Sequence, residues 1–321
     1  MDSCKVLKLA KPFLFLLYFC FLGVAAFSQE KLLVSNEPET LKLPGRVNYF
    51  LLNPLESYRL LYHHQVASGN LLIFKVRLIN HSERVVTLSA NVITAGPSDD
   101  EVFSGQLLMQ RFWQSQFLPS LNVLVLPPGS KKVLTQQWVR GGKLASGLVE
   151  LKNIEAQQFL HLEFSAEQPS ANLDLISWDI SKNINVQRTD GEIETARIFQ
   201  EQILDCESGT LNVRLGDVPF VFNAQNLPYE GHYGIWHDIR IAVPSSQNIA
   251  VSFSPKGGVA GAVLMAQDRV MTFPAQRAGV VSAPQVLAPL EKNGKYFLQL
   301  AFMPQPGSNY PIELLFTCRG Y

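Results

Sequence analysis

Short stretches of alternating apolar and polar residues, separated by turns rich in proline and glycine, limit most strongly how this chain can fold. In residues 71–92, Leu72, Phe74 and Val76 share one face of a strand, and Lys75 and Arg77 share the other. The pattern recurs at residues 121–126, 132–139, 296–302 and 312–318. Short strands at roughly ten-residue spacing are typical of antiparallel sandwiches. We therefore predict an all-β fold of two antiparallel β-sandwich domains.

The domain boundary is expected where this pattern stops. Residues 165–172 are polar, contain a proline and lack any periodicity. We place the first domain at residues 29–168 and the second at residues 169–321. Each is long enough to bury a core of its own.

One segment of the first domain has helical spacing instead. Ser98 followed by Glu101 has the form of a capping box, with Ser98 as the N-cap. Apolar residues then recur three or four positions apart as far as Phe117, although Gly105 weakens the pattern. Pro119 is expected to end the helix. A helix with so many apolar residues should pack against a sheet.

The first domain resembles bacterial extracellular immunoglobulin-like modules. The resemblance rests on residues 71–139, in which a polar turn at Asn80-His81-Ser82 and a turn at Pro127-Pro128-Gly129 separate strands. It implies a fold and no activity. The first of these turns is also a glycosylation sequon, which matters only in a host that glycosylates exported proteins.

The N-terminus predicts export. Lys5, Lys8 and Lys11 precede an apolar run at residues 12–27, and small residues flank position 27. We predict a signal peptide at residues 1–28 with cleavage before Gln29; an uncleaved anchor is the alternative. No other segment approaches membrane-spanning length. The mature chain is expected to be secreted or periplasmic, without a membrane span.

Cysteine usage agrees with an oxidising compartment. Cys206 and Cys318 remain after cleavage and are expected to form one disulfide. Metal binding is the weaker alternative, because no second cysteine or histidine lies near either residue. Lys+Arg and Asp+Glu both number 27, so no basic surface is expected for a nucleic-acid partner.

The stretch at residues 228–244 contains the first candidate site. On a strand here, His237 shares an apolar face with isoleucines and is expected to be a hydrogen-bonded core residue. The opposite face carries Trp236, Asp238 and Arg240, preceded by Tyr229 and Tyr233. This aromatic and charged surface is suited to a glycan or a protein partner. The alternative is that Trp236 packs beneath the other domain or a loop.

Histidines form the second candidate site. His63, His64 and His232 could bind copper or zinc if the fold brought them together, but adjacent histidines on a strand face opposite ways. No spacing demands a metal, and no cofactor is predicted. No nucleophile elbow or metalloprotease motif is present, so no catalytic residues are predicted. Asp238 is the first candidate should the chain be a hydrolase.

Four blocks of the chain resemble uncharacterised exported bacterial proteins in which equivalent blocks flank sandwich strands. The blocks are Tyr62-His63-His64, Gly231-His232-Tyr233-Gly234, Gly257-Gly258 and Gly307-Ser308-Asn309-Tyr310-Pro311. The likeness covers residues 38–316 and implies export and a β architecture, with no activity to transfer. We expect a non-catalytic binding or assembly protein of the cell envelope or exterior. The alternatives are a metal-binding envelope protein and a hydrolase.

Overall fold

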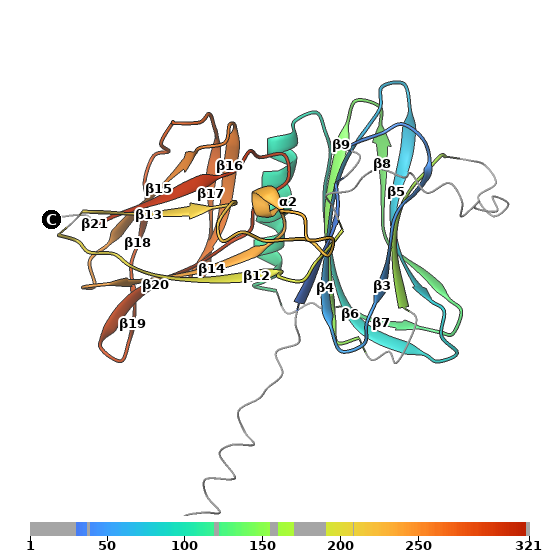
Figure 1. Cartoon of the computed structure of the whole chain (residues 1–321), viewed down its shortest axis with the longest axis horizontal. Coiled ribbons are helices and arrows are strands. Elements are labelled where there is room, and N and C mark those ends of the chain that lie inside the picture. Colours follow the sequence, from blue (N-terminus) through green and yellow to red (C-terminus); the bar gives the residue numbers. More distant parts are fainter. Residues whose placement is uncertain are drawn as a thin grey trace, which may run out of the picture.

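The computed structural model describes residues 30–36, 39–118, 122–154, 160–169, 191–207 and 209–318. These residues form four sheets and one α-helix, arranged as two β-sandwiches with the helix between them (Figure 1). The predicted all-β fold is confirmed. Most strand pairs are antiparallel, but three are parallel. In these, β1 (Glu30–Ser35) and β2 (Thr40–Leu41) both lie beside β4 (Ser57–Val66), and β12 (Arg197–Ile203) lies beside β14 (Trp236–Val243). None of the helices in these ranges is long and apolar enough to cross a membrane. The predicted signal peptide lies outside the described residues.

The first sandwich is built from sheets that we call A and B. Sheet A contains β11 (Glu192–Ile193), β1 (Glu30–Ser35), β4 (Ser57–Val66), β9 (Leu144–Lys152), β6 (Val86–Ser98) and β7 (Asn122–Leu126), with β2 (Thr40–Leu41) beside β4. Sheet B contains β3 (Gly45–Leu52), β10 (Leu160–Glu167), β5 (Leu71–Asn80) and β8 (Lys131–Arg140). Alternate residues of both sheets meet in one core, which includes Phe74, Val76 and Phe164.

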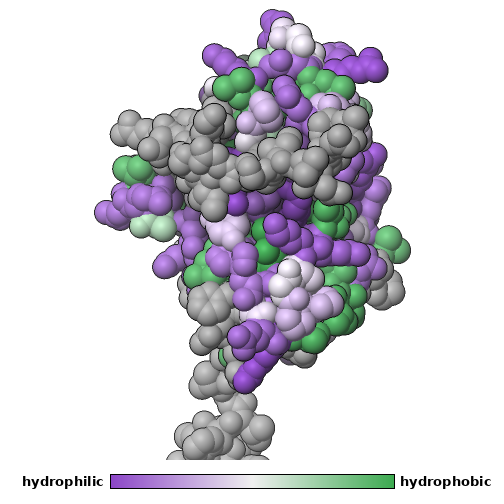
Figure 2. Space-filling view, turned by 90° about the vertical axis from the view of Figure 1, so that its right-hand side faces the viewer, coloured by the Kyte–Doolittle hydropathy of each residue, from purple (hydrophilic) through white to green (hydrophobic). Residues whose placement is uncertain are grey.

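The outer face of sheet B is largely hydrophilic (Figure 2). Arg46 and Arg77 both pair with Glu163, and Lys75 pairs with Glu167. These charges are partly or wholly buried, which makes their pairing necessary, because an unpaired buried charge is costly.

The second sandwich is built from sheets C and D. Sheet C contains β12 (Arg197–Ile203), β14 (Trp236–Val243), β20 (Lys295–Phe302), β16 (Ala260–Ala266) and β17 (Arg269–Gln276), with β19 (Leu290–Lys292) beside β20. Sheet D contains β13 (Thr210–Leu215), β21 (Ile312–Cys318), β15 (Ile249–Pro255) and β18 (Gln285–Leu287). Their inner faces share a core that includes Ile239, Phe253 and Phe302.

The expected helix is present as α2 (Glu101–Ser115), but its N-cap is not Ser98. The Asp100 side chain accepts the Phe103 backbone N–H, while Ser98 belongs to the end of β6 and accepts the Asp100 backbone N–H. A carboxylate two positions closer to the helix satisfies the first-turn N–H group directly. The helix ends at Ser115, and Pro119 lies outside the described residues.

Helix α2 lies between the two sandwiches (Figure 1). It contacts β6 and β9 of sheet A and β16 and β17 of sheet C. Leu108, Met109, Phe112 and Trp113 are buried in a third core shared by residues of both sandwiches. Trp113 Nε1 donates to the Val263 carbonyl at 3.1 Å. The apolar side chains of the helix thus pack against two sheets at once, which explains why so many of its residues are apolar.

Arg59 is a charged residue buried at this interface and is only 1% exposed. Its guanidinium pairs with Glu30 at 2.7 Å and donates to the Gly234 carbonyl at 3.0 Å. It therefore joins β4 of the first sandwich to the loop that enters β14.

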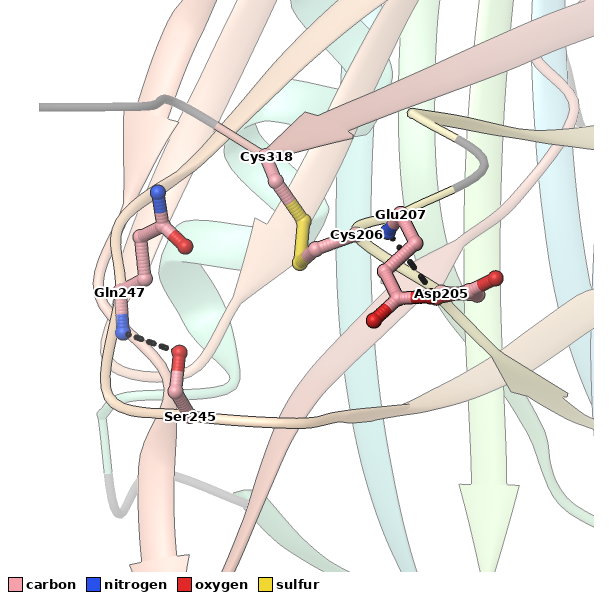
Figure 3. The surroundings of a disulfide bond; sticks show 6 residues. All are labelled: Asp205, Cys206, Glu207, Ser245, Gln247 and Cys318. Atoms are coloured by element: carbon pink, nitrogen blue, oxygen red, sulfur yellow. Dashed lines mark hydrogen bonds between the residues drawn. A yellow bond between two sulfur atoms is a disulfide. The ribbon is translucent and has the colours of Figure 1, made fainter.

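The predicted Cys206–Cys318 disulfide is confirmed. It joins the loop after β12 to the end of β21, with Cα atoms 5.5 Å apart and 112 positions between them in sequence (Figure 3). The Cys318 side chain packs against the core of the second sandwich.

The predicted domain division at residues 168 and 169 borders on residues 170–190, which lie outside the described residues. After that gap, β11 pairs with β1 in sheet A before the chain enters β12. The exact division remains a prediction.

Asn80, the asparagine of the glycosylation sequon, has a structural role. Asn80 is fully buried, and its side-chain amide donates to the carbonyls of Arg84, Leu126 and Pro127. These bonds join the turn after β5 to the turn before β8, so the amide is not available for modification in the folded chain.

Candidate functional site

A groove crosses the outer face of sheet C. Two adjoining hollows of about 540 Å³ and 410 Å³ share Arg197, Asp238 and Gln299 in their walls. The register explains this: Phe199 of β12 lies beside Asp238 of β14, and Gln299 of β20 lies beside Arg240. Their side chains point away from the core because Ile239 and Ile241, at the alternate positions, point into it.

Trp236 forms a wall of this groove and is fixed there by helix α2. Its ring lies 4.8 Å from the Trp113 ring and 5.8 Å from the Phe112 ring, both edge-to-face. The Arg59 guanidinium lies 5.6 Å from its centre on the interface side. Trp236 therefore packs against the helix of the first domain, as the alternative interpretation had it. The side chain is only half-buried, and its exposed part faces the groove.

Asp238 is held by two neighbours. Trp236 Nε1 donates to Asp238 Oδ1 at 2.9 Å, and Arg197 Nε donates to Asp238 Oδ2. Arg197 Nη2 completes a two-bond pair at 3.1 Å. The hydrogen bond to Asp238 raises the pKa of Arg197 above its ordinary value, despite burial. Asp238 is thus an acceptor of fixed geometry and not an unpaired general acid.

The far half of the groove is more open. The Arg240 guanidinium lies 4.8 Å above the Phe297 ring and 3.7 Å from Glu201. Phe199 is 73% exposed, and the Arg197 guanidinium lies 5.3 Å from its ring. An exposed aromatic ring beside ordered charged groups can stack against a ligand and also donate or accept hydrogen bonds.

Tyr229 and Tyr233 do not join this face. Tyr229 is buried, and its hydroxyl donates to the Tyr233 carbonyl at 2.8 Å. The Tyr233 hydroxyl donates to the Ser308 carbonyl at 2.9 Å. Both rings belong to the interface between the sandwiches. The loop before β14 therefore leads its aromatic side chains away from the groove.

His63 and His64 point to opposite faces of sheet A, as neighbouring strand residues must. The His64 ring lies inside the first sandwich, stacked on Phe164 at 5.1 Å, with Nε2 2.8 Å from Ser35 Oγ. His63 faces the other sandwich, with Nδ1 2.6 Å from Ser146 Oγ. Burial lowers the pKa of His63 to about 4, so it is neutral near pH 7.

His232 stacks on His237, with ring centres 5.4 Å apart. His237 is fully buried, as expected, but neither of its ring nitrogens has a hydrogen-bond partner among the described residues. The expected hydrogen bond is therefore not found there, because the neighbouring His232 ring stacks on His237 face to face and does not point a ring nitrogen at it. Burial lowers the pKa of His232 to about 4, and burial together with the neighbouring His232 lowers the pKa of His237 to about 3.

The three predicted metal ligands are not brought together by these contacts: His64 lies in the first core, His63 faces the interface and His232 lies against His237. Within the described ranges, no three or more histidine, cysteine, aspartate or glutamate residues are arranged to hold a metal ion.

Sequence reasoning missed the residues of β12 and β20 that complete the groove. Arg197, Phe199 and Glu201 alternate with Ile198 in a way that marks one outward face. That signal was present, but nothing local indicated that β12 would lie parallel to β14.

A second aromatic cluster, on the outer face of sheet B, was also missed. The Tyr49 and His161 rings stack at 4.5 Å, and the Tyr49 hydroxyl lies 3.0 Å from His81 Nε2. The Arg46 guanidinium lies 4.4 Å from the centre of the Tyr49 ring. The two strands and the turn that supply these residues are far apart in sequence.

No family model and no curated protein matches the chain. Among solved structures, it is similar to the CUB1-EGF-CUB2 domains of rat MASP-1, with 9% identity, 87% of this chain and 100% of that chain covered, and a TM-score of 0.21. It is also similar to dimeric latent PorU from Porphyromonas gingivalis, with 9% identity and a TM-score of 0.16. That match covers 85% of this chain and 18% of PorU. These scores are too low to support any inference about function.

Proposed function

We propose that this chain is an exported, non-catalytic binding protein whose groove on sheet C holds an uncharged glycan. The observation that supports this most is the groove itself, whose walls combine the exposed Phe199 ring with ordered donors and acceptors. Sugars are bound by aromatic stacking combined with hydrogen bonds from fixed polar side chains.

The charge of the groove favours a neutral ligand. Its walls carry three cationic side chains, of Arg197, Arg240 and Lys292, and three carboxylates, of Glu201, Asp238 and Asp268. The strongest pair, Arg197 with Asp238, is already formed without a ligand. Glutamine side chains at positions 200, 267 and 299 add neutral donors and acceptors. A strongly charged ligand would meet as much repulsion as attraction.

Export is part of the same proposal. Residues 1–28 have the pattern of a signal peptide, and a disulfide is a bond that persists in exported proteins and rarely in the cytosol. We place the mature chain in the periplasm or outside the cell, with an immunoglobulin-like first sandwich that supports the groove-bearing second one.

The test is a glycan array and a pull-down of protein partners with the purified mature chain. Phe199→Ala and Arg240→Ala should each weaken glycan binding about tenfold, the equivalent of about 1.4 kcal/mol. Phe220→Ala is the matched control, because Phe220 is 78% exposed and is not part of the groove.

Unchanged binding in both groove variants would overturn the assignment of the groove. If the wild type bound a protein and no glycan, and both variants lost that protein, the groove would remain the site and the ligand class would be wrong. Trp236→Ala is unsuitable as the first test, since it also removes packing against helix α2.

A further inference from the structure

A separate cleft of about 160 Å³ lies between the two sandwiches. Its first wall comes from β1, β2 and β4, with Val34, Thr40 and His63 among the lining residues. Its second wall comes from Tyr233 and residues 306–309 of the second sandwich. Glu101, the first residue of α2, closes one side. Neither sandwich alone contains this site.

The cleft is negatively charged. Glu39 and Glu101 are its only charged lining residues, and neither forms an ion pair with any described residue. Most other carboxylates at the interface have a partner, as Glu30 has Arg59. Burial and the charge of Glu39 raise the pKa of Tyr233 to about 12. The partial positive charge at the start of α2 is smaller than these two full charges.

His63 adds a neutral acceptor. The side chain is 9% exposed and lines the cleft. Its Nδ1 is engaged by Ser146, whose hydroxyl lies 3.3 Å from that of Ser104. Its Nε2 has no hydrogen bond to any described residue and accepts one in the tautomer that keeps the proton on Nδ1.

The remaining wall is apolar and aromatic. Val34, Leu61, Leu144 and Pro306 line the cleft together with Tyr233. A tyrosine ring attracts a cation to its face, and aliphatic side chains accommodate a short carbon chain. The cleft volume corresponds to about five water molecules, enough for a ligand of about five heavy atoms.

We propose that this cleft between the sandwiches binds a small primary amine, with its ammonium group toward Glu39 and Glu101 and its carbon chain against the apolar wall. Three hydrogen-bond donors on the ammonium match the two carboxylates and the free nitrogen of His63. A carboxylate ligand would meet two like charges and no cation. This inference does not depend on the ligand of the groove on sheet C.

The experiment is isothermal titration calorimetry with the intact mature chain at pH 7.5. The probes are butylamine, butyrate, which replaces the ammonium with a carboxylate, and butanol, which replaces it with a neutral hydroxyl. Butylamine should bind with one site per chain, and butyrate and butanol should give no saturable heat. Raising the salt from about 0.05 M to about 0.5 M should weaken amine binding several-fold, since both glutamates are exposed to screening.

Glu39→Gln and Glu101→Gln should each weaken butylamine binding at least tenfold. Glu83→Gln, an exposed carboxylate on the turn after β5, is the matched control and should bind as the wild type does. Thermal melting establishes that each variant is folded. The proposal is overturned if butyrate binds as tightly as butylamine, if no amine binds, or if the folded Glu39→Gln and Glu101→Gln variants both keep wild-type affinity.

Discussion

Single buried polar residues determine how the chain responds to mutation. Arg59 lies in the contact between the sandwiches, and the histidine pair His232–His237 lies in the second sandwich, with the His237 ring near Phe302; all three histidine and arginine side chains are almost fully buried. Arg59 is charged and bonded through both terminal nitrogens, whereas His237 is neutral and its ring has no hydrogen bond to a described residue. Arg59 is therefore tested by substitution, and the histidines are tested by the pH dependence of stability.

Arg59→Met should destabilise the chain by about 3–5 kcal/mol. The substitution keeps the aliphatic length but leaves the Glu30 carboxylate and the Gly234 carbonyl without their partner. Urea denaturation measures the loss. Arg214→Met is the control: its pair with Asp217 is exposed, and such pairs contribute little to stability because solvent screens them. Equal losses in the two variants would contradict the role given to Arg59.

Stability should fall as the pH falls below about 6.5. The pKa values of His63, His232 and His237 lie at about 4, 4 and 3 in the folded chain, whereas unfolded histidines titrate near 6.5. Between these values the unfolded chain binds more protons, so each histidine lowers the free energy of unfolding by about 1.4 kcal/mol per pH unit.

Urea denaturation between pH 7.5 and pH 5 tests this. His237→Phe keeps an aromatic ring at the position but cannot be protonated, so its stability should change less steeply with pH than that of the wild type. Stability that is constant from pH 7.5 to pH 5 would show that these histidines titrate normally in the folded chain.

At the scale of elements, helix α2 is the part on which both sandwiches depend. Its glycine, which weakened the helical pattern in the sequence, lies against the second sandwich: a β carbon on Gly105 would be 2.0 Å from the Pro306 carbonyl oxygen. Gln305 Nε2 donates to the Val102 carbonyl at 3.3 Å in the same contact. The loop after β20 therefore approaches the helix backbone closely.

Gly105→Ala should consequently destabilise the chain, although alanine favours an isolated helix by about 1 kcal/mol over glycine. The clash is with backbone, which cannot move aside as a flexible side chain can. Gly45→Ala is the control, because a β carbon there would have no atom within 4 Å. Thermal melting of the three proteins gives the comparison. A Gly105→Ala variant more stable than the wild type would mean that loop and helix are not in contact.

At the scale of the whole molecule, two kinds of connection hold distant segments together. The α2 interface joins the sandwiches without covalent bonds. The disulfide joins the loop after β12, early in the sequence of the second sandwich, to the end of its last strand, β21. The cleft proposed to bind an amine depends on the first connection, since its walls come from both sandwiches.

Removal of the disulfide by Cys206→Ala with Cys318→Ala should lower the free energy of unfolding by up to about 4–5 kcal/mol, the chain-entropy value for a loop of about 110 residues. Reducing agent should destabilise the wild type and leave the double variant unchanged. Thiol titration of a native chain that begins at Gln29 should find no free thiol. Two free thiols would contradict the bond.

The sequence by itself predicted the strand pattern, the position of helix α2 and the pairing of Cys206 with Cys318. The first two depend on local alternation and capping residues, and the third depends on the cysteine count after residue 28, which leaves one possible partner. It placed the helix cap at Ser98 instead of Asp100, because both residues can cap and only the end of β6 decides between them.

Only the tertiary structure decided what surrounds each candidate residue. Asp238 and Arg240 lie in a groove because β12 and β20, from distant parts of the chain, flank β14. Trp236 is held by α2, the tyrosines turn into the interface, and His63 and Tyr233 meet at one cleft although 170 positions separate them. Alternation assigns a side chain to one face of a strand, but which strand or helix covers that face depends on how the sheets pack.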